Sequence, residues 1–175
     1  MLTAIAAATL AASQVVPVPD PYPFPETTAS NLSRERFTVP DDLPGDARVL
    51  LLAYEQEHQF DIDTWLAALE KMSADRPGLA YYELPTVQGY GPIFSRWLDG
   101  VMRDGIPDAD QRARTITLYV NKRKYLKALR VEDAATIDVM LIDKAGDVVW
   151  RARGAVSPET RDALQTAVDD MLGAA

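Results

Sequence analysis

Apolar residues in this chain gather in short runs separated by longer amphipathic stretches. The run Arg48–Tyr54 is continuously apolar after its first residue, which predicts a central strand covered on both faces. Leu79–Leu84 predicts a second strand. Thr115–Val120 is rich in β-branched and aromatic residues and predicts a third.

Helical periodicity fills the stretches after these strands. Asp61–Ser73 predicts a helix whose apolar side chains share one face. Those side chains are Ile62, Trp65, Leu66, Leu69 and Met72. A second helix is expected to begin at Pro92 and end near Gly105. Its expected inward residues are Ile93, Phe94, Trp97, Leu98, Val101 and Met102. A short helix is expected over Lys122–Leu129.

The C-terminal third has the pattern strand, tight turn, strand, helix. The two strands are expected over Thr136–Asp143 and Val148–Gly154, joined by a turn at Lys144–Asp147. Ser157 is the expected N-cap of the last helix and Pro158 its first residue. Its expected inward residues are Leu164, Val168, Met171 and Leu172. The order of elements predicts an α/β fold with a mixed β-sheet sandwiched by helices.

The first 45 residues differ in composition from the rest. Residues 1–13 form an Ala-rich apolar run that resembles a signal peptide without its basic n-region, which predicts an exported, periplasmic or envelope protein. The alternative is an Ala-rich tail on a cytoplasmic protein. Residues 14–45 hold seven of the twelve prolines, spaced in a way that favours extended backbone unable to join a sheet. We expect them to form a linker, either a tether or a strap along a folded domain at 46–175.

Composition excludes several classes of function. The chain has no cysteine, so it cannot form disulfides, thiolate metal sites or a cysteine nucleophile. The net charge of −8 argues against nucleic acid as a partner. No apolar run reaches the roughly 18–20 residues that span a bilayer, so an integral membrane protein is not expected.

Over Asp46–Gly173 the order of elements resembles the thioredoxin-like superfamily. A thioredoxin carries its C-x-x-C motif between the first strand and the first helix, where this chain has Glu55–Phe60. Thioredoxins also have a cis-proline before the strand that corresponds to the one starting near Thr136, and here Asp133–Ala135 occupies that place. The resemblance therefore implies the fold without its thiol–disulfide chemistry.

A narrower resemblance is to the thioredoxin-related assembly factor of the mitochondrial ATP synthase and its bacterial relatives. It rests on four stretches: the strand into Phe60–Trp65, Tyr82–Val87, Thr115–Asn121, and Val139–Asp143 continuing through Trp150 to Gly154. The resemblance implies a binding or chaperone role toward a subunit of a membrane complex.

The polar loop Glu55, Gln56, Glu57 and His58 replaces the redox motif of that fold. His58 is the only histidine of the chain, and beside carboxylates it could act as a general base or as part of a metal site. A zinc site would require more nitrogen or sulfur ligands than one histidine provides. The structural interpretation is a solvated loop whose acidic residues favour the N-terminus of the next helix.

Charge reverses between Arg112 and Arg130, where seven basic residues occur without an acidic one. Such a segment could bind an acidic partner or anionic lipid headgroups, or it could be an exposed edge kept soluble by its charge. The residues expected to bind a partner are Arg112, Arg114, Lys122, Arg123, Lys124 and Lys127.

The sequence as a whole therefore predicts a non-catalytic module that binds a protein, with no cofactor, no metal and no catalytic residue. Trp65, Trp97 and Trp150 are expected in or beside the core. The alternative function is an enzyme or metal-binding protein that uses Glu55, Glu57 and His58.

Overall fold

The computed structural model describes residues 13–173. Within them, nine strands form one mixed sheet in the order β1-β9-β8-β5-β6-β7-β3-β4, with β2 paired to β9. Three central strands run parallel, β8 runs antiparallel to β5, and β9 runs antiparallel to β8. Their bounds are β5 (Ala47–Ala53), β6 (Leu79–Gln88), β7 (Ile116–Val120), β8 (Asp138–Ile142) and β9 (Asp147–Arg153).

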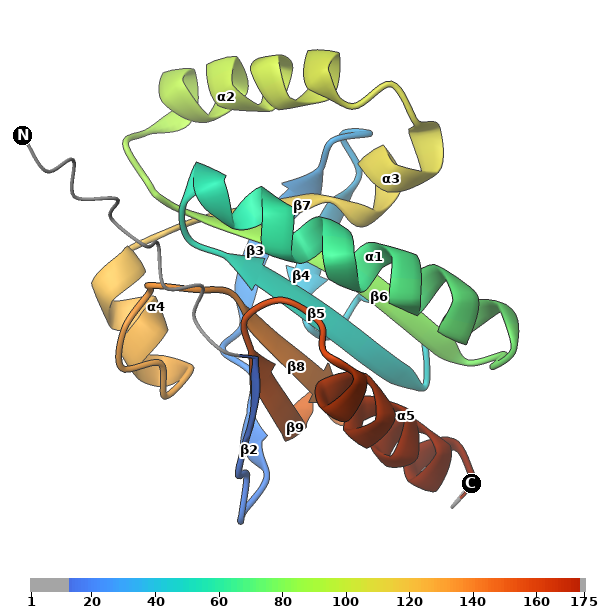
Figure 1. The fold of residues 1–175 in the computed structure, drawn as a ribbon. Coiled ribbons are helices and arrows are strands. Elements are labelled where there is room, and N and C mark those ends of the chain that lie inside the picture. Colours follow the sequence, from blue (N-terminus) through green and yellow to red (C-terminus); the bar gives the residue numbers. More distant parts are fainter. Residues whose placement is uncertain (1–12, 174–175) are drawn as a thin grey trace, which may run out of the picture.

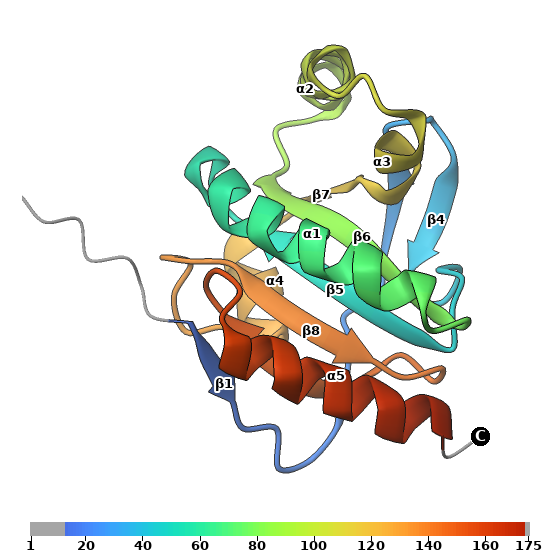
Figure 2. The ribbon, with the colours of Figure 1, turned by 45° about the vertical axis from the view of Figure 1, so that its right-hand side comes forward.

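Helices cover both faces of this sheet (Figure 1). The long helices α1 (Gln59–Ala74) and α5 (Pro158–Gly173) lie on one face, and Figure 2 shows them side by side in front of it. The shorter α4 (Lys122–Ala128) lies on the opposite face. This arrangement confirms the α/β fold with a mixed sheet between helices.

The alternation of side chains along β5 divides the core into two clusters. Val49 and Leu51 point toward α1 and α5, where Trp65 is completely buried. Leu50 and Leu52 point to the other face and pack in the cluster that includes α4. Because every one of these positions on β5 is buried, the strand reads as a continuous apolar run rather than an alternating one.

The prediction that the Pro-rich segment stays outside the sheet is wrong. Residues 14–45 contain four strands, and Tyr22 and Phe24 of this segment are almost completely buried in the cluster with α4. The strands are β1 (Gln14–Val16), β2 (Tyr22–Pro23), β3 (Thr27–Asn31) and β4 (Arg36–Val39). The segment is thus a strap that crosses one face of the sheet and supplies strands to both of its edges.

Proline spacing explains why these strands are short. Pro17, Pro19, Pro21 and Pro25 lie between strands, where no ladder hydrogen bond needs their missing N–H. Pro23 ends the two-residue β2, which pairs with β9 alone. The predicted signal-like segment falls on residues 1–13, and residues 1–12 lie outside the described part of the chain.

The C-terminal pattern was predicted closely. Gly146, at a φ of 89°, turns the β8–β9 hairpin, and its N–H donates to the carbonyl of Asp143 at 3.0 Å. Ser157 caps α5 as expected, because its Oγ accepts the N–H of Thr160 at 3.2 Å.

Two further helices follow β6. The expected helix is present as α2 (Pro92–Gly105). A short helix that the sequence analysis missed, α3 (Ala109–Arg114), is capped by Asp108, whose side chain accepts the N–H of Gln111 at 2.6 Å. No helix in the described residues is long and apolar enough to cross a bilayer.

Candidate functional site

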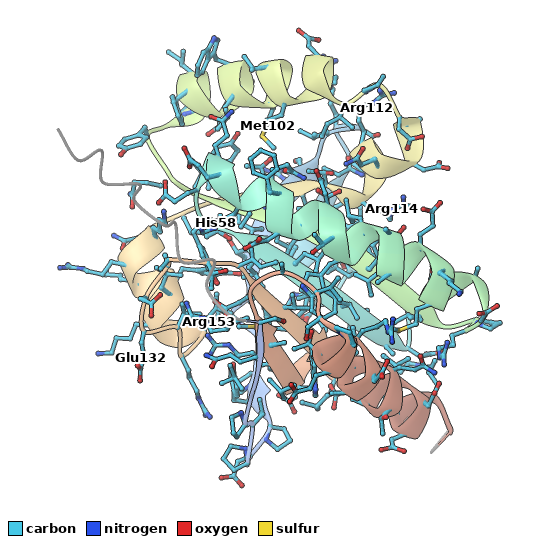
Figure 3. All side chains as sticks on the ribbon, in the orientation of Figure 1. His58, Met102, Arg112, Arg114, Glu132 and Arg153 are labelled. Carbon is cyan, nitrogen blue, oxygen red and sulfur yellow. The ribbon has the colours of Figure 1, made fainter. Side chains whose placement is uncertain are left out.

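The parallel strands β5, β6 and β7 end at the same side of the sheet, where open α/β sheets usually bind their ligands. We call this side the carboxyl edge; it comprises Tyr54–His58, Gln88–Gly91 and Asn121–Lys122. Lys122 connects its parts, because its Nζ donates to the carbonyl oxygen of Tyr54 at 2.7 Å and its N–H donates to the side chain of Gln88 at 3.1 Å. The carboxyl edge lies at the N-terminus of α1, beside the label of His58 in Figure 3.

Glu55 is engaged with Lys122 rather than with His58. The carboxylate accepts a hydrogen bond from the Lys122 ammonium at 2.7 Å, and this bond lowers the pKa of Glu55. Gln56 and Glu57 are exposed on the single 3-10 turn η1 (Gln56–His58).

His58 has a structural partner. Only 8% of it is exposed, and its Nδ1 accepts the backbone N–H of Tyr54 at 3.1 Å, which closes the turn after β5. Its ring also packs edge-on against the ring of Tyr54. The Glu55 carboxylate and the His58 ring thus hydrogen-bond to different partners, and no group of three acidic or histidine side chains in the described residues could hold a metal ion.

Beneath this loop lies a buried polar network that the sequence analysis missed. Asp138 is completely buried in β8, and its carboxylate accepts hydrogen bonds from the Tyr54 hydroxyl at 2.9 Å and from Arg151 Nε at 2.6 Å. Arg153 lies 3.6 Å from the same carboxylate and forms a second ion pair with Asp133 at 2.8 Å. The network joins the carboxyl edge to the β8–β9 hairpin.

Burial dominates the ionisation of this network. It raises the pKa of Asp138, against the lowering effect of the Arg151 charge, and it raises the pKa of Tyr54 well above the ordinary value. Both oxygens of Asp138 are occupied by donors from the protein, and none of its surface is exposed. The arrangement fixes the loop, and it leaves no free carboxylate oxygen for acid–base chemistry. An aspartate inside an apolar strand, with arginines on the next strand, is the signal that could have revealed it.

The prediction is wrong for three of the six residues expected to point inward from α2, because they are exposed. The other three, Phe94, Leu98 and Met102, are half-buried. Ile93, Trp97 and Val101 are 86%, 62% and 51% exposed, and we call these three residues the α2 stripe. No residue of α2 is buried. Trp97 accordingly lies outside the core, whereas Trp65 is buried and Trp150 packs against the core.

The polar underside of α2 explains this orientation. Side chains alternate along β7, so that Ile116 and Leu118 enter the core while Thr117 and Tyr119 face the helix. Polar groups of α2 meet them: the Tyr119 hydroxyl donates to Asp99 at 2.7 Å, and Thr117 contacts Met102, which Figure 3 shows on the side of the helix toward the sheet. Because the sheet beneath α2 presents these hydroxyls, the side of the helix that carries Ile93, Trp97 and Val101 faces outward.

Exposed aromatic residues extend this surface toward the carboxyl edge. Tyr90 is 72% exposed and packs edge-on against Phe94 with ring centroids 5.3 Å apart, and Phe94 in turn lies 5.9 Å from Trp97. Phe60, at the start of α1, is 78% exposed. Exposed apolar residues that contact one another, as Tyr90, Phe94 and Trp97 do, are typical of interaction surfaces.

The basic segment divides into two separate groups. Arg112 and Arg114 belong to α3, on the opposite side of the molecule from α4 (Figure 3). Arg112 donates to the carbonyl oxygens of Ile106 and Pro107, both at 2.8 Å, and the Arg114 guanidinium lies 4.7 Å from the centre of the Tyr81 ring.

The other predicted partner-binding residues all belong to α4. They are Lys122, Arg123, Lys124 and Lys127. Lys122 is held at the carboxyl edge, while the other three are exposed. The six cations are thus close in sequence, but the fold separates the two in α3 from the four in α4.

Comparisons with known proteins define the fold. No protein-family model matches this chain, and no curated protein matches it. Solved structures do: BsSco, a member of the Sco family of cytochrome c oxidase assembly proteins, superposes with a TM-score of 0.60 at 12% identity, covering 89% of this chain and 98% of that one. A secreted thiol-disulfide isomerase from Corynebacterium glutamicum gives 0.58 at 13% identity over 97% and 98% of the two chains.

A hypothetical protein from Sinorhizobium meliloti 1021 is similar too, with a TM-score of 0.59 and 17% identity over 93% of this chain and 89% of that one. The thioredoxin-like fold expected from the sequence is therefore confirmed. These structures do not show the narrower relation to the ATP-synthase assembly factor.

Proposed function

We propose that this protein is a non-catalytic, thioredoxin-like module that binds a protein partner through the α2 stripe. The observation that carries the proposal is the exposure of Ile93, Trp97 and Val101 on one side of a helix whose other side is fixed to the sheet. The polypeptide has no thiol with which to act on disulfides.

The α2 stripe is suited to an apolar helix of the partner. Its three residues recur every fourth position, which places them in a row of about 12 Å along the helix. Hydrogen bonds from Tyr119 to Asp99 and from Arg103 Nε to the carbonyl oxygen of Leu32, at 2.7 and 2.8 Å, prevent α2 from turning this row inward. A surface that is already in its binding conformation avoids part of the entropic cost of association.

We further propose that the partner is a subunit of a membrane complex and that the protein acts in the cell envelope as an assembly factor or chaperone. The resemblance of four sequence stretches to the ATP-synthase assembly factor supports this role, as does the similarity of fold to a protein described as belonging to a family of cytochrome c oxidase assembly proteins. The signal-like residues 1–13 and the fold shared with a secreted isomerase support the location.

Affinity capture from gently solubilised envelopes, with a C-terminal tag and mild crosslinking, tests the proposal. We expect subunits of a membrane complex, ATP synthase first, to be enriched by the native protein and lost with the double variant Ile93→Ser/Trp97→Ser. Arg96→Ser is the matched control, because Arg96 is exposed on the same helix outside the α2 stripe. Equal capture by the native protein and the double variant would refute docking on α2.

The alternative of an enzyme or metal protein at Glu55, Glu57 and His58 receives no support from their geometry. Glu55 binds Lys122, and His58 uses Nδ1 to accept a backbone N–H. Calorimetric titration with zinc, copper and calcium checks this directly, and we expect no binding heat above that of dilution. Stoichiometric uptake lost in His58→Ala would favour the alternative.

A further inference from the structure

A second surface of the protein has a different chemistry. Beside the C-terminal half of α4 is an open hollow of about 480 Å³. It is lined by Arg123, Leu126, Lys127, Arg130, Val131 and Glu132. Three of its six residues are cations, in a protein whose net charge is −8. The hollow is therefore locally positive on an acidic molecule.

None of these three cations is neutralised by the fold. Among the described residues, no carboxylate lies within 4.0 Å of the charged groups of Arg123, Lys127 or Arg130, whereas Lys122, Arg151 and Arg153 each have such a partner. Glu132 lines the hollow but forms no ion pair in the described part of the chain. The positive groups are thus available to an external anion.

Arg130 is held in place before any ligand binds. It ends α4 in the left-handed conformation, with a φ of 57°, and its guanidinium lies 4.0 Å from the centre of the Tyr22 ring. Its carbonyl oxygen accepts a hydrogen bond from Arg151 at 2.9 Å, and the Tyr22 hydroxyl donates to the carbonyl of Leu129 at 3.2 Å. A left-handed arginine is uncommon, and these contacts explain how it persists.

We propose that this hollow binds an acidic peptide segment of the protein partner. The inference rests on the proposed function, in that the ligand belongs to a protein, and it adds the chemistry that the partner must carry. Side chains of glutamate or aspartate would pair with Arg123, Lys127 and Arg130, and Leu126 and the buried Val131 would contact their aliphatic parts.

An extended anion fits this hollow better than a compact one. Arg123 and Lys127 are one helical turn apart and Arg130 follows the helix, so the three charges are distributed along the hollow. The C-terminal end of a helix carries partial negative charge, which disfavours a small anion held close to the backbone there. A peptide with several carboxylates can meet each cation separately and stay outside that region.

Fluorescence anisotropy with a labelled hexaglutamate peptide tests the inference, at low ionic strength where exposed charges act over their longest range. The peptide should bind the native protein, and the double variant Lys127→Gln/Arg130→Gln should weaken binding about tenfold, consistent with the loss of charge-assisted hydrogen bonds. Lys71→Gln, which removes an exposed cation of α1, should leave binding nearly unchanged.

Glu132 provides a test with the opposite sign. Because Glu132 lines the hollow and its negative charge repels an acidic ligand, Glu132→Gln should strengthen hexaglutamate binding about two- to threefold. Circular dichroism of each variant checks that the fold is retained. A loss of affinity in Glu132→Gln, or equal affinity in the native protein and the double variant, would overturn the inference.

Two further arms separate the possible ligands. A hexaglutamine peptide should not bind, since the interaction requires charge. Inorganic phosphate should bind no more tightly than the peptide, and phosphate binding without peptide binding would overturn the choice of an acidic segment. If the peptide fails while capture still depends on the α2 stripe, the inference falls and the proposed function stands.

Discussion

The hydroxyl of Tyr54 donates a hydrogen bond of 2.9 Å to the buried carboxylate of Asp138, 84 residues further along the chain. This bond joins the turn after β5 to the strand β8. It occurs at the carboxyl edge, below a loop that sequence reasoning had considered as a place for chemistry. The relationship indicates that the polar residues here hold the edge in shape.

Removing the donor should destabilise the protein. Tyr54→Phe leaves one oxygen of a completely buried carboxylate without its hydrogen bond, so we expect the free energy of unfolding to fall by about 1–3 kcal/mol. Urea denaturation measures this change. Tyr90→Phe is the control, because Tyr90 is 72% exposed and should lose almost nothing. Equal stabilities of the two variants would mean that the bond has no energetic role.

His58 should act as a structural residue. His58→Ala removes the acceptor of the Tyr54 N–H at a nearly buried position, at a cost of about 1–2 kcal/mol, or a melting temperature lower by about 2–8 °C. Differential scanning calorimetry measures the shift, with the exposed Gln56→Ala as control. An unchanged melting temperature together with a lost activity would instead support a catalytic histidine.

Two tryptophans should behave in opposite ways. Trp65 is completely buried and its indole N–H donates to the carbonyl of Gly154 at 2.9 Å, so Trp65→Ala should cost about 3–5 kcal/mol. Trp97 is 62% exposed, and Trp97→Ala should change stability by less than about 0.5 kcal/mol. Both are measured by urea denaturation followed by far-UV circular dichroism. A large loss for Trp97→Ala would show that α2 packs more tightly than the structure indicates.

The Pro-rich strap should contribute to stability as a core element does. Phe24 is 3% exposed and packs edge-on against Tyr125 of α4 with ring centroids 6.3 Å apart, so Phe24→Ala should cost about 3–5 kcal/mol. The exposed Asp20 of the same segment provides the comparison, since Asp20→Ala should leave the free energy of unfolding nearly unchanged. If chemical denaturation finds Phe24→Ala as stable as the native protein, the segment does not contribute to the core and is only a tether.

Glu83 should make stability depend on pH. Burial raises the pKa of this carboxyl above 4.5, against the lowering effect of hydrogen bonds from side chains that include Gln111 at 3.3 Å and Thr115 at 3.4 Å. The folded protein therefore binds the proton more tightly than the unfolded chain does, and stability falls as pH rises from about 4.5 through the folded pKa.

Glu83→Gln removes this titration while keeping a polar side chain of the same size. The variant should gain stability relative to the native protein as pH increases above 4.5, and the gain should level off once Glu83 is fully ionised. Urea midpoints of both proteins between pH 4 and pH 8 give the difference. A difference that is constant over this range would show that the carboxyl titrates as an ordinary exposed one.

Much of the central fold could be predicted because its pattern is strong. β5 reads as an uninterrupted apolar run, and α1 and α5 carry clear apolar faces with a cap at Ser157. The strands β1–β4 could not be predicted, since each is short, and β1, β2 and β3 pair with strands far along the chain, such as Arg153 opposite Gln14. Strands of this kind have no periodicity of their own to detect.

The orientation of α2 shows a different limit. Its amphipathic pattern correctly groups Ile93, Trp97 and Val101 on one face, but a pattern alone does not say which face meets the protein. Thr117 and Tyr119 determine the orientation of α2, because their hydroxyls project beneath the helix and contact its underside. The alternation along β7 was visible in the sequence, whereas the position of α2 above that strand was not.

The position of the loop Glu55–His58 could be predicted from the sequence, but the contacts of its side chains could not. Lys122, the partner of Glu55, belongs to α4, and Asp138, the partner of the adjacent Tyr54, belongs to β8. Only folding brings them near the loop, so clustered charges along the chain do not identify them. For the basic segment the error is the opposite one: closeness in sequence suggests a single binding surface, but Arg112 and Lys127 lie far apart in space.

The strap also has a consequence for synthesis. During translation from the N-terminus, β1 and β3 leave the ribosome long before β9 and β7, the strands with which they pair. Until then β1 lacks its partner and β3 has only its hairpin partner β4, so their free edges could associate with other nascent chains. The prolines from Pro17 to Pro25 have no backbone N–H, so this part of the chain cannot form the continuous hydrogen bonding that aggregation requires. The residues that shorten the strands therefore also protect the nascent segment from aggregation until its partner strands have been synthesised.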